Sequence, residues 1–257
     1  MTEYFDIDKR AKMDIPYIND MISFADIPEK ACVLEVGCGS GIVTKCIKDE
    51  RQDVELYGLD LNSEYILTNQ EKYSDSNIKF LTGDVCSMDF SDGCFDVIFS
   101  RYLFETMSME NRKKAIKEMM RVLKNDGRIV IYTNITEILV PARPSKSMMK
   151  VWNSMKHIND LLGNRNGKMI EFIDYLYQHY KVEVQPVYKD SISPGNQFLI
   201  DYYKYTDNEM KNLKSNILVR IGLLSEEDLL RYNRDLLEWL SNDGYMYQLQ
   251  GIFKISK

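Results

Sequence analysis

The stretch Val33-Leu-Glu-Val-Gly-Cys-Gly-Ser-Gly41 decides the fold of this chain. An apolar run from Cys32 to Val36 is typical of a buried strand, and the Gly-x-Gly-x-Gly that follows predicts a tight turn into a helix. Glycine has no Cβ, so such a turn bends sharply and lets backbone N–H groups approach a ligand closely. Glycine-rich turns also join strands to helices where no ligand binds, so the surrounding residues decide what this one does.

Acidic residues mark the ends of three predicted strands. Glu35 lies in the first strand, the run Val54-Glu-Leu-Tyr-Gly-Leu-Asp60 ends in a carboxylate, and so does Ile78-Lys-Phe-Leu-Thr-Gly-Asp84. Ligands of open α/β sheets bind at the carboxyl ends of the strands. We therefore expect Glu35, Asp60 and Asp84 to lie around one crevice.

This set of acids favours a cationic ligand over a dinucleotide. The usual dinucleotide pattern has a third glycine three residues after the second, and that position here is Ile42. Three carboxylates would also repel a pyrophosphate. Asp60 can accept both hydroxyls of a ribose, Asp84 can accept an adenine amino group, and Glu35 adds negative potential near a positive centre. S-adenosylmethionine offers all of these groups.

Residues 31–136 resemble the class I S-adenosylmethionine-dependent methyltransferases of the bacterial small-molecule type. Five motifs in the family's order carry this resemblance: Leu34-Glu-Val-Gly-Cys-Gly-Ser-Gly41, Gly58-Leu-Asp60, Gly83-Asp84, Phe95-Asp-Val-Ile-Phe-Ser100 and Val122-Leu-Lys-Asn-Asp-Gly-Arg-Ile-Val130. The resemblance implies an α/β, Rossmann-like, seven-stranded and mostly parallel sheet. Its last strand is antiparallel, helices cover both faces, and helical lid insertions rise from it.

The same resemblance implies which residues contact the cofactor. They follow the first four strands and are Glu35, Gly37, Cys38, Gly39, Gly41, Asp60, Leu61, Gly83, Asp84, Val85, Ser100, Arg101 and Tyr102. Simpler roles stay open for some of them. Asp60 can be a helix cap, Glu35 can support the turn, and Tyr102 and Phe104 can be core residues. No catalytic residue is assigned, and His157 and Tyr102 are the candidates.

The rest of the chain is organised around this core. Residues 1–30 are predicted as an N-terminal helical flap, in which Tyr4 and Arg10 can fold over the cofactor's carboxylate. Strands are expected at 31–36, 54–59, 78–82, 95–99, 128–133, 181–188 and 245–256, with helices at 9–25, 41–48, 63–73, 110–123 and 167–180. Residues 137–166 read as a lid insertion. Residues 167–257 complete the sheet and carry a second helical insertion at about 190–240.

Composition restricts the partners and the compartment. A net charge of −6 with no basic stripe argues against nucleic acid, and no apolar run is long enough to cross a membrane. The acidic N-terminus lacks a signal-peptide pattern, so a cytoplasmic location is expected. The five cysteines contain no Cys-x-x-Cys pair, which predicts free thiols and no metal. A monomer or a homodimer fits equally well.

The function predicted from these features is methyl transfer to a nitrogen or oxygen of a small-molecule metabolite. Because charge is lost in the displacement, the protein mainly supplies alignment and excludes water. The sequence shows no evident general base, which favours an amine, a carboxylate or an acidic phenol as acceptor. Two alternatives remain: a non-catalytic cofactor-binding or partner protein with the same fold, and a nucleotide-dependent oxidoreductase.

Overall fold

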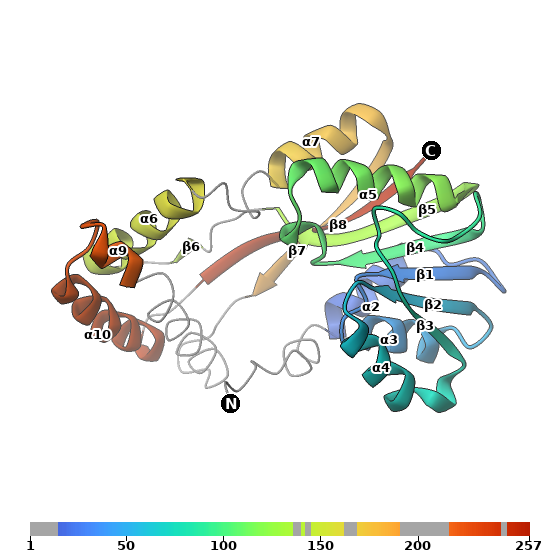
Figure 1. Cartoon of the computed structure of the whole chain (residues 1–257), viewed down its shortest axis with the longest axis horizontal. Coiled ribbons are helices and arrows are strands. Elements are labelled where there is room, and N and C mark those ends of the chain that lie inside the picture. The colour runs from blue at the N-terminus through green and yellow to red at the C-terminus, as the bar shows by residue number, and fades with distance from the viewer. Residues whose placement is uncertain (1–14, 136–139, 142–144, 162–168, 191–215, 243–245) are drawn as a thin grey trace. The chain divides into compact units, whose positions relative to one another are not determined.

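The computed structural model describes residues 15–135, 140–141, 145–161, 169–190, 216–242 and 246–257 (Figure 1). The chain forms two compact units. The first comprises residues 1–135, 168–187 and 249–257, and the second comprises residues 136–167 and 188–248. Tyr4 and Arg10, expected in an N-terminal flap, lie outside the described residues.

The sheet has the strand order β3-β2-β1-β4-β5-β8, and β7 pairs with β8. Strands β1 to β5 run parallel, and β8 runs antiparallel to β5. The seven expected strands and the antiparallel last strand are therefore confirmed. A two-residue strand, β6, pairs with β8 and was not expected. The bounds are β1 (Cys32–Val36), β2 (Glu55–Asp60), β3 (Ile78–Thr82), β4 (Phe95–Arg101), β5 (Leu123–Asn134), β6 (Val140–Pro141), β7 (Lys181–Asp190) and β8 (Met246–Ser256).

Helices join and cover the strands of the first unit. They are α2 (Ile15–Phe24), α3 (Ile42–Glu50), α4 (Ser63–Lys72), α5 (Met109–Val122) and α7 (Met169–His179), with short 3-10 turns η1 (Ser74–Ser76) and η2 (Phe104–Thr106). The Asn62 side chain accepts a hydrogen bond from the Glu64 N–H at 2.8 Å, so Asn62 is the cap of α4.

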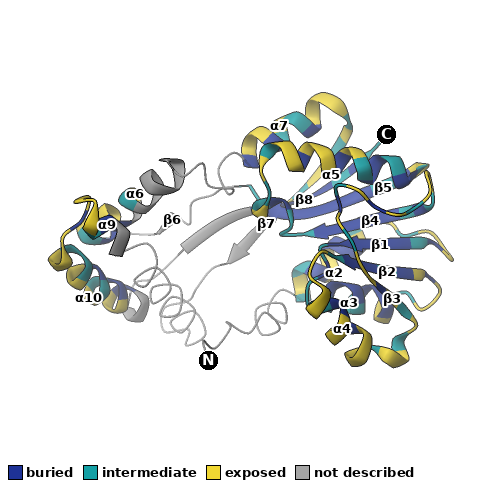
Figure 2. Ribbon diagram, in the orientation of Figure 1, coloured by how far each residue is buried: buried dark blue, intermediate teal, exposed yellow. Residues whose placement is uncertain are grey.

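Alternating side chains of the central strands supply two cores. Leu34 and Ile98 pack on one face of the sheet with residues of α5 and α7, whereas Val33 and Val97 pack on the other face with residues of α2 and α3. The period of two in a strand puts neighbouring residues on opposite faces. Figure 2 shows the strands buried between helices whose outer surfaces are exposed. This double cover explains why the strands read as continuous apolar runs.

The second unit contains α6 (Lys146–Leu161), α9 (Asn216–Arg220) and α10 (Glu226–Asn242). Two polar contacts join α6 to α10: the Ser147 hydroxyl donates to Asp235 at 2.5 Å, and Lys150 pairs with Asp228 at 2.7 Å. This unit includes both segments that the sequence predicts as insertions, and their role as a lid stays a prediction. Across the described ranges, no helix combines the length and apolar character needed to cross a bilayer.

Candidate functional site

The glycine turn after β1 is anchored to the end of β2. The N–H groups of Gly37 and Cys38 donate to the Leu59 carbonyl at 2.7 and 3.0 Å. The Gly39 N–H donates to the Asp60 carboxylate at 2.8 Å. The first two sequence motifs therefore meet at the carboxyl edge of the sheet, as the sequence predicts.

Two side chains of the α4 region hold the same turn from the other side. The Asn69 side-chain amide donates to the Gly39 carbonyl at 2.7 Å, and the Tyr73 hydroxyl donates to the Ser40 carbonyl at 3.2 Å. Sequence reasoning assigned neither residue a role. The available signal was a polar residue, Asn69, three positions after the buried Ile66 on the inner face of a predicted helix.

Asp60 also connects the second motif to the third. Its carboxylate accepts the Asn62 N–H at 2.9 Å, and its carbonyl accepts the Gly83 N–H at 2.9 Å. Asp84 then accepts the Cys86 N–H through its side chain at 2.8 Å. Next to Asp60, Leu61 is 72 % exposed. Asp60 and Asp84 thus border one edge together with an exposed apolar side chain.

Glu35 differs from the other two acids because its carboxyl group is buried. It is 2 % exposed and accepts a hydrogen bond from the Thr44 hydroxyl of α3. Burial raises the pKa of Glu35 from its ordinary 4.5 to about 8, although the Thr44 hydrogen bond and the Arg101 charge act in the opposite direction. At neutral pH the side chain is mostly protonated. The negative potential expected from Glu35 is therefore weak.

The segment after β4 packs directly on the glycine turn. A Cβ built on Gly37 would lie 2.9 Å from the Leu103 side chain, so Leu103 covers that glycine. Ser100 is fully buried beside its pairing partner Val36. Arg101 lies over the Tyr102 ring at 4.6 Å, which satisfies the geometry of a cation–π contact.

Of two aromatic side chains in this segment, Tyr102 packs against the core and Phe104 belongs to it. Tyr102 has a φ of 54° and its ring lies 5.3 Å from that of Tyr132. Phe104 is fully buried and stacks on Phe172 at 4.8 Å. These contacts support the core interpretation of Phe104. His157, the other catalytic candidate, lies in α6 of the second unit, and its side chain is outside the described structure.

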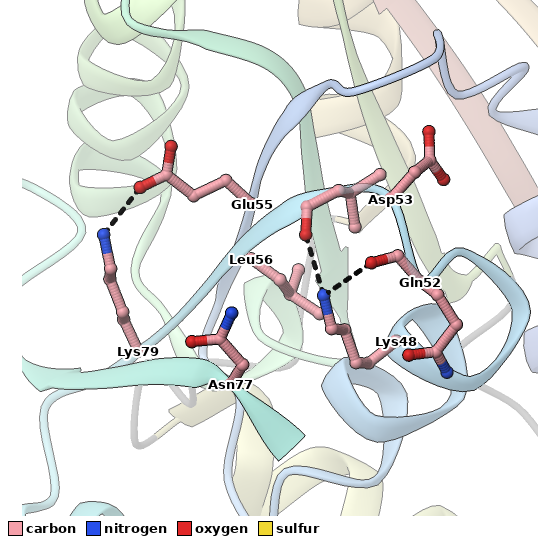
Figure 3. A pocket seen from close by; sticks show the side chains of 8 residues that line it. Lys48, Gln52, Asp53, Glu55, Leu56, Asn77 and Lys79 are labelled. Atoms are coloured by element: carbon pink, nitrogen blue, oxygen red, sulfur yellow. Dashed lines mark hydrogen bonds and ion pairs between the residues drawn. The ribbon is translucent and has the colours of Figure 1, made fainter. Parts of the chain in front are cut away.

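A cavity of about 390 Å³ lies at the amino ends of β2 and β3, away from the carboxyl ends that the glycine turn follows (Figure 3). It is lined by residues before or at the start of β2 and β3: Lys48, Gln52, Asp53, Val54, Glu55, Leu56, Asn77 and Lys79. Lys48 donates to the carbonyls of Gln52 and Val54, and Lys79 pairs with Glu55 at 2.6 Å. Its cationic groups have partners within the protein, and the glycine turn lies at the other ends of the strands. This cavity is therefore separate from the candidate site.

Substitution of Gly41 tests the packing of the turn. Gly41 has a φ of 74°, and a Cβ there would meet Tyr73 at 2.8 Å and Asn69 at 3.1 Å. Gly39 is the matched control, because its φ is 50° and a Cβ there meets nothing within 4 Å. Both alanine variants carry the left-handed backbone cost of roughly 1–2 kcal/mol. We expect urea unfolding to show Gly41→Ala less stable than Gly39→Ala by about 1–3 kcal/mol because of overpacking. Equal losses of unfolding free energy in the two variants would mean that the Asn69 and Tyr73 side chains move aside without cost.

Known proteins share both the motifs and the fold. A family model described as a methyltransferase domain matches residues 34–131. The demethylmenaquinone methyltransferase of Thermotoga maritima is 34 % identical over 104 residues, which are 40 % of this chain and 43 % of that protein. The chain thus spans less than half the length of that relative.

Two solved structures extend the likeness over nearly the whole chain. The YcgJ protein of Bacillus subtilis has a TM-score of 0.58 and 20 % identity, covering 93 % of this chain and 97 % of that one. The phosphoethanolamine N-methyltransferase 2 of Haemonchus contortus, in complex with S-adenosyl-L-methionine, has a TM-score of 0.56 and 15 % identity, covering 94 % and 52 %. At such identities the likeness is one of fold.

Proposed function

We propose a methyltransferase activity for this chain, which belongs to the class I S-adenosylmethionine-dependent methyltransferase family through residues 34–131. The methyl donor is S-adenosyl-L-methionine, and the product is S-adenosyl-L-homocysteine. The acceptor is a nitrogen or oxygen atom of a small-molecule metabolite. A monomeric or homodimeric state stays a prediction.

One observation carries this proposal: the Gly39 N–H and the Asp60 carboxylate are hydrogen-bonded at 2.8 Å. The bond fixes a half-buried turn next to an acid that has further lone pairs. A carboxylate oxygen accepts more than one hydrogen bond, so Asp60 can accept ribose hydroxyls while it holds the turn. No basic residue is needed here, because the ligand carries no phosphate.

The residues present fit the cofactor by shape and by chemistry. Open space lies above Gly39, where a Cβ would meet nothing within 4 Å. The exposed Leu61 side chain can contact the nucleoside, and Asp84 can accept the adenine amino group. The contact of Val85 with the adenine stays a prediction, since Val85 is 8 % exposed and packs in the core. Residues of the turn and of the segment after β4 would hold the methionine part: Gly37, Cys38, Gly41, Ser100, Arg101 and Tyr102. Gly83, which follows β3, would lie on the nucleoside side, and the buried Glu35, bonded to Thr44, would support the turn.

The bound cofactor supplies a sulfonium methyl group that is reactive by itself. The contribution of the chain is then alignment and exclusion of water. Asp60 and the turn would orient the nucleoside, and Leu103, which packs against Gly37, would exclude water beside the turn. Such a site accelerates transfer without an acid or a base acting on the donor.

Ligand-dependent unfolding temperature tests the cofactor assignment. A ligand at 100 times its dissociation constant adds about 2.7 kcal/mol to stability. We expect S-adenosylhomocysteine to raise the melting temperature by several degrees and NAD to leave it unchanged. The reverse result would favour the oxidoreductase alternative.

Turnover separates an enzyme from a binding protein. Protein is incubated with methyl-labelled S-adenosylmethionine and a low-molecular-mass cell extract, and label in the extract is followed by mass spectrometry. Incorporation that depends on protein is expected. Cofactor binding without any incorporation would favour the non-catalytic alternative.

A further inference from the structure

Glu105 is a carboxylate held in place through only one of its two oxygens. Its Oε1 accepts the Thr133 hydroxyl at 2.7 Å and the Asn134 N–H at 3.0 Å. Its Oε2 is buried and has no hydrogen-bond partner among the described residues. A buried polar oxygen without a partner is unfavourable, and such atoms in folded proteins call for an explanation. The arrangement leaves a fixed, unsatisfied acceptor.

A buried hydrogen-bond network holds the β5 residues that bind this carboxylate. The Tyr132 hydroxyl donates to Gln250, and the Gln250 amide donates to Asn134 at 2.8 Å. Tyr132, Thr133 and Gln250 are each at most 2 % exposed. Networks of this kind rigidify the groups that they connect. Glu105 Oε1 is thus fixed by the end of β5, where Gln250 of β8 holds the Asn134 side chain, while Oε2 is left without such a bond.

The position of Glu105 relates it to the proposed cofactor site. It lies in η2, directly after β4, and Leu103 of the same segment covers Gly37 of the glycine turn. Thr133 and Asn134 end β5, which pairs with β4. All of these residues belong to the first unit. The unsatisfied oxygen therefore lies at the carboxyl edge where transfer is proposed.

We propose that Glu105 Oε2 binds the methyl acceptor, so that the acceptor carries an N–H or O–H group at the atom that is methylated. This inference rests on the proposed methyltransferase function and narrows its acceptor to amines, alcohols and phenols. A carboxylate acceptor is excluded because it has no proton to donate and would repel Glu105. The N–H or O–H group of the methyl acceptor supplies the hydrogen-bond donor that Oε2 lacks.

The proton balance follows from this contact. The lone pair of the acceptor forms the new bond to the methyl carbon, the carbon–sulfur bond breaks, and its electron pair stays on sulfur. The acceptor proton passes to Glu105 Oε2 and then to solvent. One positive charge is lost from the sulfonium and one proton is released, so the total charge is conserved.

Selective blocking of an extract tests the acceptor class. A low-molecular-mass extract of bacterial cells is divided and treated with acetic anhydride, which caps amines and hydroxyls, or with acidic methanol, which esterifies carboxylic acids. Each part is incubated with methyl-labelled S-adenosylmethionine and protein. We expect acetylation to abolish incorporation and esterification to preserve it. Incorporation that survives acetylation, or its absence from untreated extract, would overturn the proposal.

Two matched variants test the residue. Glu105→Gln keeps an oxygen for Thr133 and Asn134 but replaces the free acceptor by a donor. Glu118→Gln is the control, because Glu118 also accepts a backbone N–H, from Met88 at 2.8 Å. We expect at least a ten-fold loss of incorporation rate in Glu105→Gln only, with S-adenosylhomocysteine affinity within two-fold of wild type. Unchanged incorporation would overturn the assignment.

The affinity measurement also separates failure of the acceptor-binding role of Glu105 from failure of the proposed methyltransferase function. An equal loss of S-adenosylhomocysteine affinity in Glu105→Gln would mean that Oε2 pairs with the ammonium of the cofactor, and would overturn the acceptor role. A wild-type protein that does not bind S-adenosylhomocysteine would remove the proposed function itself.

Discussion

Replacing Asp60 by alanine is expected to weaken S-adenosylhomocysteine binding about 5- to 150-fold. The reason is that ligand hydroxyls would lose a charged acceptor, which is worth about 1–3 kcal/mol. The variant also removes the acceptor of the Gly39 N–H, so the glycine turn loses one anchor. Isothermal titration at a temperature where both proteins are folded measures the effect.

Asp96→Ala is the matched control for this variant. Asp96 also accepts a backbone N–H, from Cys32 at the start of β1 at 2.8 Å, but it lies at the amino end of β4. Both variants should lose stability, and only Asp60→Ala should lose affinity. Wild-type affinity in Asp60→Ala would remove Asp60 from the cofactor site.

The parallel part of the fold is predictable from sequence because its strands are buried on both faces. Such strands read as uninterrupted apolar runs, and glycines or acids mark where they end. The predicted and observed bounds of β3 agree at 78–82, β1 begins one residue later than predicted, and β2 is shifted by one residue at both ends. By contrast, β5 begins at Leu123, five residues before the prediction, because polar residues occupy its first half. The residue types at 123–127 do not indicate a strand.

The candidate site is only partly predictable, since its motifs lie along the chain but its supports do not. Gly39 and Asp60 follow from the spacing of two strand ends. The contact of Asn69 with Gly39 joins residues thirty positions apart, and no local pattern predicts it. The same holds for the contact between Glu105, which follows β4, and Thr133, which lies near the end of β5. A polar residue on an otherwise apolar face is the available clue, and it does not name a partner.

Burial of Glu35 shows a second limit of sequence reasoning. An acid within an apolar strand was assigned to the crevice by analogy with Asp60 and Asp84. The side chain in fact points at Thr44, because residue 35 is inside the strand while Asp60 is the last residue of its own. One residue of difference in position decides whether a carboxyl group is buried or reaches the edge.

The buried Glu35 is expected to make the stability of the ligand-free protein depend on pH. Its folded pKa of about 8 lies above its ordinary 4.5, so between these values the folded state binds more protons than the unfolded state. Stability from this group is therefore complete below about pH 4.5 and is lost as pH rises toward 8. The slope approaches about 1.4 kcal/mol for each pH unit. Urea unfolding of wild type and Glu35→Gln between pH 5 and 8 isolates the effect as their difference.

Thr44→Val separates burial from hydrogen bonding as the cause of this pH dependence. The Thr44 hydroxyl stabilises the ionised form of Glu35, so its removal should raise the folded pKa further. The loss of stability would then continue to higher pH than in wild type. Parallel stability curves for wild type and Glu35→Gln would mean that water reaches the carboxyl group. If the slope is present but does not move in Thr44→Val, burial alone sets the pKa, and Thr44 only fills space between β1 and α3.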